Sequence, residues 1–320
     1  MTTTLTARGP EDLLAAVPVV LGFHPADSLV MLTFGGRHTF HARVDLPPRD
    51  DLDDRLPALC EILRAPCLVH EVGRVAFVVY SADASIAARL GVRLRREFAV
   101  GEIGVIHVLR VDAGRWWSVP ARPGEGERGG RSYDDVSHPF AAQAVFHGLV
   151  TLASRHELRE TLAADIEAQT RVVACQASLS PAGGGEADWL VELVGRLVRS
   201  RGDPDDAQAA RLVRAVQEVR ARDAALLSVS RETASEHLRV WSGLLRRAPD
   251  AQVPTVAVLT AFAAWQSGQG ALAWCALDRC LEVEPTHALA RGLAECLSRA
   301  VPPSAWREIA DLSTGESDGR

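Results

Sequence analysis

A short segment that reads Gly-Phe-His-Pro-Ala-Asp-Ser, ending at Ser28, places a histidine close to an aspartate and a serine. Histidine titrates near neutral pH, so His24 suits proton transfer or ligand contact, with Asp27 or Asp45 as the carboxylate that orients it. The same residues also make a rigid turn before a strand, because Pro25 restricts the backbone and the Asp and Ser side chains bond to nearby amides. Both interpretations stay open, and the turn is the simpler one.

Charged residues follow at alternating positions. From Thr39 to Asp45 apolar and polar residues alternate, which puts His41, Arg43 and Asp45 on one side of an expected strand. Such a row can bind an anion, and it can equally be a solvated face. We keep both alternatives.

A third segment reads Arg-Trp-Trp-Ser from Arg115 to Ser118 and follows the last expected strand, where open α/β sheets often bind ligands. Adjacent indoles in extended chain point to opposite faces, so one can join the core while the other offers a stacking surface for a base, a sugar or a partner. Capping of the sheet edge is the alternative. The candidate ligand-binding residues are therefore His24, Asp27, Ser28, Arg43, Asp45, Arg115, Trp116 and Trp117.

Absent residue types exclude several chemistries. The 320 residues contain no lysine, so all 35 basic residues are arginine. P-loop enzymes, protein kinases and Schiff-base enzymes depend on a lysine. The six cysteines lack zinc-site spacing and suit buried positions in a reducing cytoplasm. We assign no catalytic residue, no metal and no cofactor. The sequence therefore does not decide whether the protein is an enzyme, and it favours a protein that is not.

Charge and hydropathy point to a cytoplasmic protein. The net charge is −6, and neither half of the chain is basic, which argues against a nucleic-acid partner. The apolar run Leu13–Leu21 is broken by Pro18 and has no basic flank, so we do not expect a signal peptide. No apolar stretch approaches the roughly 20 residues of a membrane span.

The elements that would position these residues form a small α/β domain over residues 1–118. Two strands joined at Gly35-Gly36 form a hairpin, and then a helix after Asp50, a strand over 75–80, a helix over about 86–94 and a strand over 103–111 follow. The order β-β-α-β-α-β predicts a small mixed sheet with helices packed on it. The strand order is not readable.

The rest of the chain reads as an exposed loop over 119–136, an α-helical array over 137–312 and a frayed polar tail over 313–320. A segment at about 256–285 resembles a single tetratricopeptide hairpin, in which Ala273 and Cys280 allow close helix approach and Gly268 turns the chain. We regard three tryptophans of this half as candidates for an exposed contact surface. They are Trp241, Trp265 and Trp274.

The blocks quoted above also occur together in one family. The run from Leu14 through the Gly-Phe-His-Pro segment, the Arg-Val-Asp-Leu-Pro block at 43–47, the Arg-Trp-Trp-Ser block and the Ala-Phe-Ala-Ala-Trp hairpin resemble the actinobacterial domain of unknown function 4192 family over about residues 8–302. Family members often carry cysteines after Arg-Trp-Trp-Ser. This chain has none from Val119 to Gly130, which argues against a metal or redox role there. The resemblance implies no activity.

Two functions follow as expectations. The first is an intracellular binding or regulatory module, with a protein partner on the helical half or an unidentified small ligand. The alternative is a hydrolase or transferase that acts on a small anionic substrate in a cleft of the N-terminal domain. A partner, a cleft or a basic face would distinguish binding, catalysis and nucleic-acid recognition.

Overall fold

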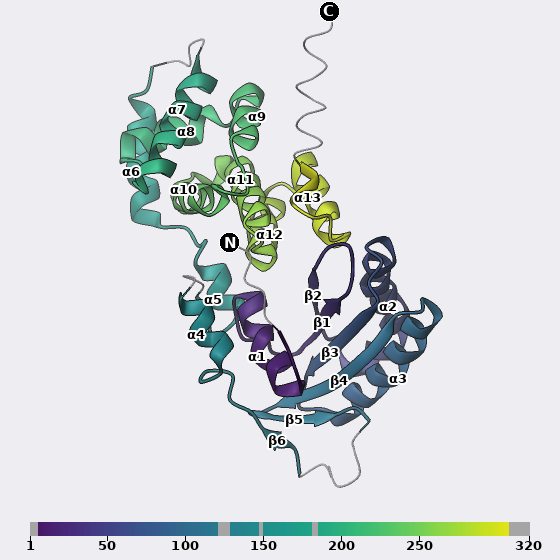
Figure 1. Ribbon diagram of the computed structural model, residues 1–320. Helices are drawn as coiled ribbons and strands as arrows, with labels where there is room; N and C mark the ends of the chain where they lie inside the picture. Colours follow the sequence, from purple (N-terminus) through teal and green to yellow (C-terminus); the bar gives the residue numbers. More distant parts are fainter. Residues whose placement is uncertain (1–5, 121–128, 147–149, 181–184, 307–320) are drawn as a thin grey trace, which may run out of the picture. The chain divides into compact units, whose positions relative to one another are not determined.

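The computed structural model describes residues 6–120, 129–146, 150–180 and 185–306 (Figure 1). The chain forms two compact units. The first comprises residues 1–155 with Ser298–Ala300, and the second comprises residues 156–297 with 301–320. The expected tail over 313–320 lies outside the described residues.

The first unit is built on a six-stranded mixed sheet, which confirms the predicted α/β fold class. Its strand order is β2-β1-β3-β4-β5-β6. The β3–β4 pair is parallel and every other neighbouring pair is antiparallel. The strands are β1 (Ser28–Phe34), β2 (His41–Asp45), β3 (Arg74–Tyr80), β4 (Gly104–Asp112), β5 (Arg115–Ser118) and β6 (Arg131–Ser132).

Two long helices cover one face of this sheet. They are α2 (Leu52–Val69), preceded by the 3-10 turn η1 (Arg49–Asp51), and α3 (Ala84–Val100). Their apolar sides share a core with alternate residues of the strands, which include Met31 and Phe77. Phe40, Ala42 and Val44 pack against this core, so the alternation read in β2 is confirmed.

The opposite face is covered by a helix that the predicted order omits, α1 (Pro10–Leu21). Leu13, Leu14 and Val17 pack there on strand residues. Pro10 occupies the first helical position, where its fixed φ already matches a helix and its missing N–H is not needed. Gly22 ends the helix in the left-handed region with φ +78°. The run that we read only as an apolar stretch is therefore a core helix.

Residues 115–136 also differ from expectation. The Arg-Trp-Trp-Ser block is strand β5, hydrogen-bonded to β4, and β6 lies within the segment predicted to be an exposed loop, of which 121–128 lie outside the described residues. The next helix, α4 (Pro139–Phe146), packs against α1 and belongs to the first unit rather than to the helical half.

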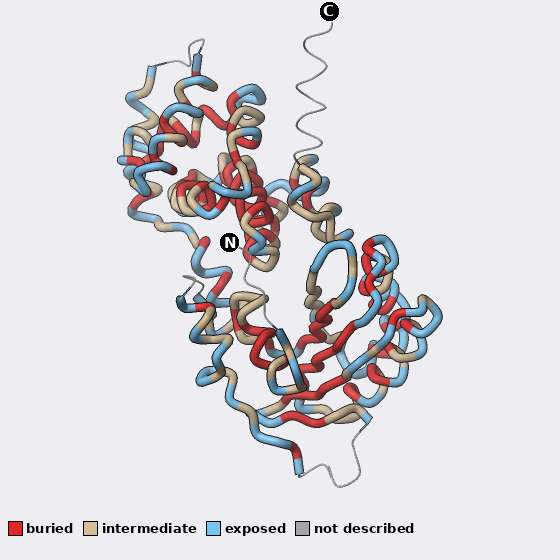
Figure 2. The backbone as a smooth tube through the Cα atoms, viewed as in Figure 1, coloured by how far each residue is buried: buried red, intermediate tan, exposed pale blue. Residues whose placement is uncertain are grey.

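The second unit is helical. Its α-helices are α5 (Arg155–Glu160, starting at the boundary), α6 (Ile166–Ala177), α7 (Glu186–Ser200), α8 (Asp206–Ala215), α9 (Val219–Leu227), α10 (Ala234–Arg247), α11 (Val253–Gln266), α12 (Gly270–Val283) and α13 (Ala288–Ser298), with the 3-10 turn η2 (Asp250–Gln252) before α11. Helix α11 is buried along almost its whole length, and Figure 2 shows it in red. It is the centre of this core.

Helices α11 and α12 pack together as a hairpin at the predicted place. Gly268 has φ +79°, and Ala273 and Cys280 are fully buried, as close helix approach requires. The expectation of exposed tryptophans was wrong for two of the three. Trp241 and Trp265 are buried and Trp274 is half-buried, because these indoles fill the core.

Candidate functional site

The β-ladder places several predicted residues in one row across the sheet. Paired positions run from strand to strand through Asp45, Ser28, Tyr80, Val111 and Trp116. Side chains of one row share a face, and here it is the face covered by α1. We call this end of that face the paired end, because Ser28, Arg43 and Asp45 are bonded to one another there.

Ser28 and Arg43, which lie on neighbouring strands at this end, are bonded to each other. The Ser28 hydroxyl accepts hydrogen bonds from Arg43 Nε at 3.0 Å and Nη2 at 2.7 Å, and it donates to the Ala26 carbonyl. Arg43 Nη2 also lies 2.6 Å from Asp45 Oδ1. The hydroxyl and the guanidinium are thus both engaged in local structure.

His24 has a carboxylate partner, but a different one from those expected. Its Nδ1 lies 3.3 Å from Asp135 Oδ2. Asp27 is exposed in the left-handed region with φ +44°, and its carbonyl accepts the amide of Leu46. Asp27 therefore forms the turn that leads into β1, which the sequence could not distinguish from a catalytic role.

The Arg-Trp-Trp-Ser residues hold the far strands together. Arg115 donates to the Gly130 carbonyl and so links β5 to the start of β6. Trp116 is buried on the α1 face, and Trp117 points to the opposite face under Arg110, whose Cζ lies 3.8 Å from the ring centroid. Both indoles are covered, so neither offers an open ring for stacking.

His41 does not supply positive charge to this face. Burial lowers the pKa of its imidazole to about 4, and its Nδ1 accepts the Thr33 amide at 3.4 Å. The imidazole is neutral near pH 7. The alternating row of β2 therefore has one cation, Arg43, which is already paired.

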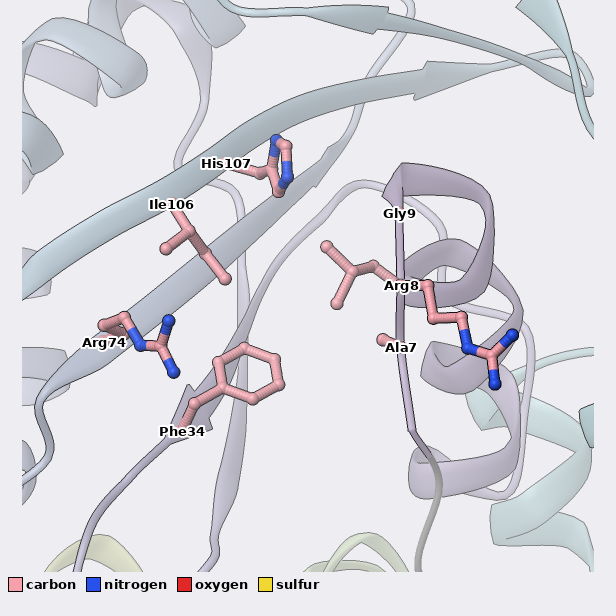
Figure 3. Close-up of a pocket in the computed structure, with 8 residues that line it drawn as sticks. Ala7, Arg8, Gly9, Phe34, Arg74, Ile106 and His107 are labelled. Carbon is pink, nitrogen blue, oxygen red and sulfur yellow. The ribbon is translucent and has the colours of Figure 1, made fainter.

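A groove lies at the other end of the same face (Figure 3). Its volume is about 290 Å³. The lining residues are Ala7, Arg8, Gly9, Leu13, Phe34, Arg74, Ile106 and His107. They come from the segment that leads into α1, from the end of β1, from the start of β3 and from β4.

A β-bulge shapes this groove. Val75 pairs with Val105, but Ala76 pairs with His107, so Ile106 is an extra residue in β4. Neighbouring residues of a regular strand point to opposite faces, and a bulge changes this alternation. Both Ile106 and His107 line the groove, and Ile106 is 41% exposed. We call this the groove end.

The groove was not predicted from the sequence. The consecutive apolar residues Val105 and Ile106 interrupt strict alternation at the place of the bulge, but Val108 and Leu109 do so where the pairing is regular. Arg74 stands immediately before a buried run, where an arginine is an ordinary strand boundary. The groove residues are far apart in the chain, so spacing alone does not associate them.

Two features are absent from the described residues, a metal-binding cluster and a membrane-spanning helix. No group of three or more His, Cys, Asp or Glu side chains there could hold a metal ion. In the same part of the chain, no helix combines the length and apolar character of a membrane span.

Comparisons with known proteins identify a family and nothing finer. No curated protein and no solved structure matches this chain. The family model described as "Domain of unknown function (DUF4192)" matches residues 10–304, which include most of both compact units. The chain therefore belongs to the DUF4192 family.

Proposed function

We propose that this protein is a binding protein and that the groove end of its first unit takes a small molecule. The observation that carries the proposal is the bulge, which brings Ile106 into a concave site together with Phe34 and Leu13. Ligand sites combine apolar walls with a few polar groups. Arg74 and His107 are the polar groups at this wall.

The alternative, a hydrolase or transferase, has less support. Its proposed cleft required His24, Asp27, Arg43, Asp45 and Arg115 to face one substrate. Four of these five side chains have local partners. His24 pairs with Asp135, Arg43 with Ser28 and Asp45, and Arg115 with the Gly130 carbonyl. A catalytic group needs a free path to the reacting atom.

A protein partner on the helical unit is also less favoured, because two of the three tryptophans that suggested it are core residues. We propose a cytoplasmic location. The six cysteines are free thiols, and disulfides are rare where thiols stay reduced.

The test is a fragment titration monitored at isoleucine methyl groups. The chain has six isoleucines, of which Ile106 lines the groove and Ile62 lies on the outer side of α2. A ligand of the groove shifts the Ile106 methyl signal saturably and leaves that of Ile62 unchanged. The Ile106→Val variant assigns the signal.

Matched variants separate the groove from general surface effects. Ile106→Glu should abolish binding measured by calorimetry, whereas Ile62→Glu, at a position 59% exposed on α2, should keep it. Binding that survives Ile106→Glu would contradict the proposal. If the protein converts a bound compound and His24→Ala abolishes this turnover, the hydrolase or transferase hypothesis would be supported instead.

A further inference from the structure

We infer that the ligand of the groove is a small monoanion with an apolar body, whose carboxylate-like head binds Arg74. This inference rests on the proposed function and specifies the ligand class of the same site. It depends on the charge, the apolar walls and the size of the groove.

The charge of the groove is supplied by Arg74. Arg74 is exposed, and among the described residues none forms a hydrogen bond or ion pair with its side chain. Figure 3 shows its guanidinium turned toward the ring of Phe34, across the sheet side of the groove. An unpaired guanidinium beside a concave surface attracts an anion.

Two acids that are close in sequence to groove residues, Glu71 and Asp12, have other partners. Glu71 is bonded to Arg37. Asp12 accepts the Arg8 amide at 2.6 Å and lies 3.1 Å from His138 Nε2. The hydrogen bond from the Arg8 backbone amide is the main cause that lowers the pKa of Asp12. This carboxylate therefore stays charged and keeps its own partners. Neither carboxylate pairs with Arg74, whose positive charge is available to a ligand.

The head group follows from the geometry of arginine. A guanidinium is planar and matches a carboxylate through two parallel hydrogen bonds. Arg8 also lines the groove, but Figure 3 shows its side chain extending away from the strands. Of the two arginines labelled in Figure 3, Arg74 alone faces the groove from the sheet. A ligand with one negative charge therefore suits the groove better than a ligand with several.

The body of the ligand follows from the remaining walls. Leu13, Phe34 and Ile106 supply apolar surface from three different elements. A volume of about 290 Å³ is at the small end of the roughly 300–1,000 Å³ typical of ligand sites. A short acyl or aryl carboxylate meets these requirements, whereas a nucleoside triphosphate is too large and too highly charged.

The experiment titrates the full chain with phenylacetate and with two close analogues, neutral phenylacetamide and cationic phenethylamine. Acetate and inorganic phosphate serve as anions without an apolar body. We expect phenylacetate to shift the Ile106 methyl signal saturably. Each of the four other probes should bind at least tenfold more weakly, because it lacks either the charge or the body.

Two variants test the role of Arg74. Arg74→Gln should weaken phenylacetate binding at least tenfold. Arg96→Gln removes the same charge from an exposed position on α3, which covers the opposite face of the sheet, and should leave the affinity unchanged. Equal losses in the two variants would show that only net charge matters, and would overturn the inference.

Other outcomes separate this inference from the proposed function. If phenylacetamide binds as well as phenylacetate and Arg74→Gln has no effect, the ligand need not be an anion. This result would overturn the inference but would leave the groove as a binding site. If neither these probes nor the fragment library shifts Ile106, both proposals fail. If phenylacetate binds only after residues 1–5 are deleted, the occupant is the chain's own N-terminal segment, and the inference is overturned.

Discussion

The two ends of one sheet face differ in how their polar groups are satisfied. At the paired end, Ser28, Arg43 and Asp45 are bonded to one another. At the groove end, Arg74 has no partner among the described residues, and Ile106 is exposed beside it. A polar cluster whose members satisfy one another contributes to stability, whereas an unsatisfied cation at a concave apolar wall can bind something else.

The comparison implies that changes at the paired end reduce stability more than changes at the groove end. The largest expected effect is that of Trp116→Ala. Trp116 is buried in the core under α1, so truncation should cost about 3–5 kcal/mol of unfolding free energy. Phe34→Ala at the half-buried groove wall should cost less than half as much. Urea unfolding followed by circular dichroism measures both, and equal losses would break the comparison.

The next effect concerns the Ser28 hydroxyl. Ser28→Ala removes an acceptor of two hydrogen bonds from Arg43, whose side chain is only 14% exposed. Bonds to a charged group contribute more than neutral ones, so the variant should lose about 2 kcal/mol. Thr39→Ala, at an exposed position of the β1–β2 connection, is the control and should be close to neutral. The same urea titration compares the two variants.

A smaller effect should depend on pH. The pKa of His41 is about 4 in the folded protein and about 6.5 when unfolded, so the unfolded state binds the proton more readily. Its contribution to stability is present above pH 6.5 and is lost as the pH falls toward 4. Allowing for partial exposure, we expect a loss of about 1 kcal/mol between pH 7 and pH 5.

Hydrogen exchange of residues 28–45 at these two pH values measures the loss, and His41→Gln should remove it. His237 in the second unit also has a pKa lowered to about 4 by burial, so exchange of residues 234–247 is an internal reference that His41→Gln should not change. An unchanged pH dependence in residues 28–45 of His41→Gln would assign the effect to other groups.

The smallest expected effect is that of Arg74→Gln on stability. An exposed side chain without a partner contributes little to folding, so the unfolding free energy should change by less than about 0.5 kcal/mol. The same variant should lose ligand affinity. A stability loss comparable to that of Ser28→Ala would mean that Arg74 is structural and would remove the contrast between the two ends.

Much of the fold was predictable because it depends on local periodicity. The alternation in β2 correctly placed Phe40 toward the α2–α3 core, and Gly268 correctly marked the turn between α11 and α12. Helix α1 was missed, because Pro18 interrupts the pattern that ordinarily identifies a helix. Strand β5 was missed as a separate element, since four residues carry too little periodicity.

The candidate site was less predictable. The sequence associated His24 with Asp27 or Asp45, but the partner, Asp135, lies more than a hundred positions away. It also offered Trp116 or Trp117 as an open stacking surface, and both are covered. Sequence spacing shows which residue types are near one another along the chain, and it does not show which side chains are already bonded.

By itself, the sequence determined the family, the α/β and helical classes of the two parts, and the absence of lysine chemistry. These depend on composition, motifs and local periodicity. The tertiary structure alone decided that Ser28 and Arg43 are paired while Arg74 is not, and that Ile106 borders a groove. The physical reason is that hydrogen-bond satisfaction, strand register and concavity arise from contacts between residues that are distant in the chain.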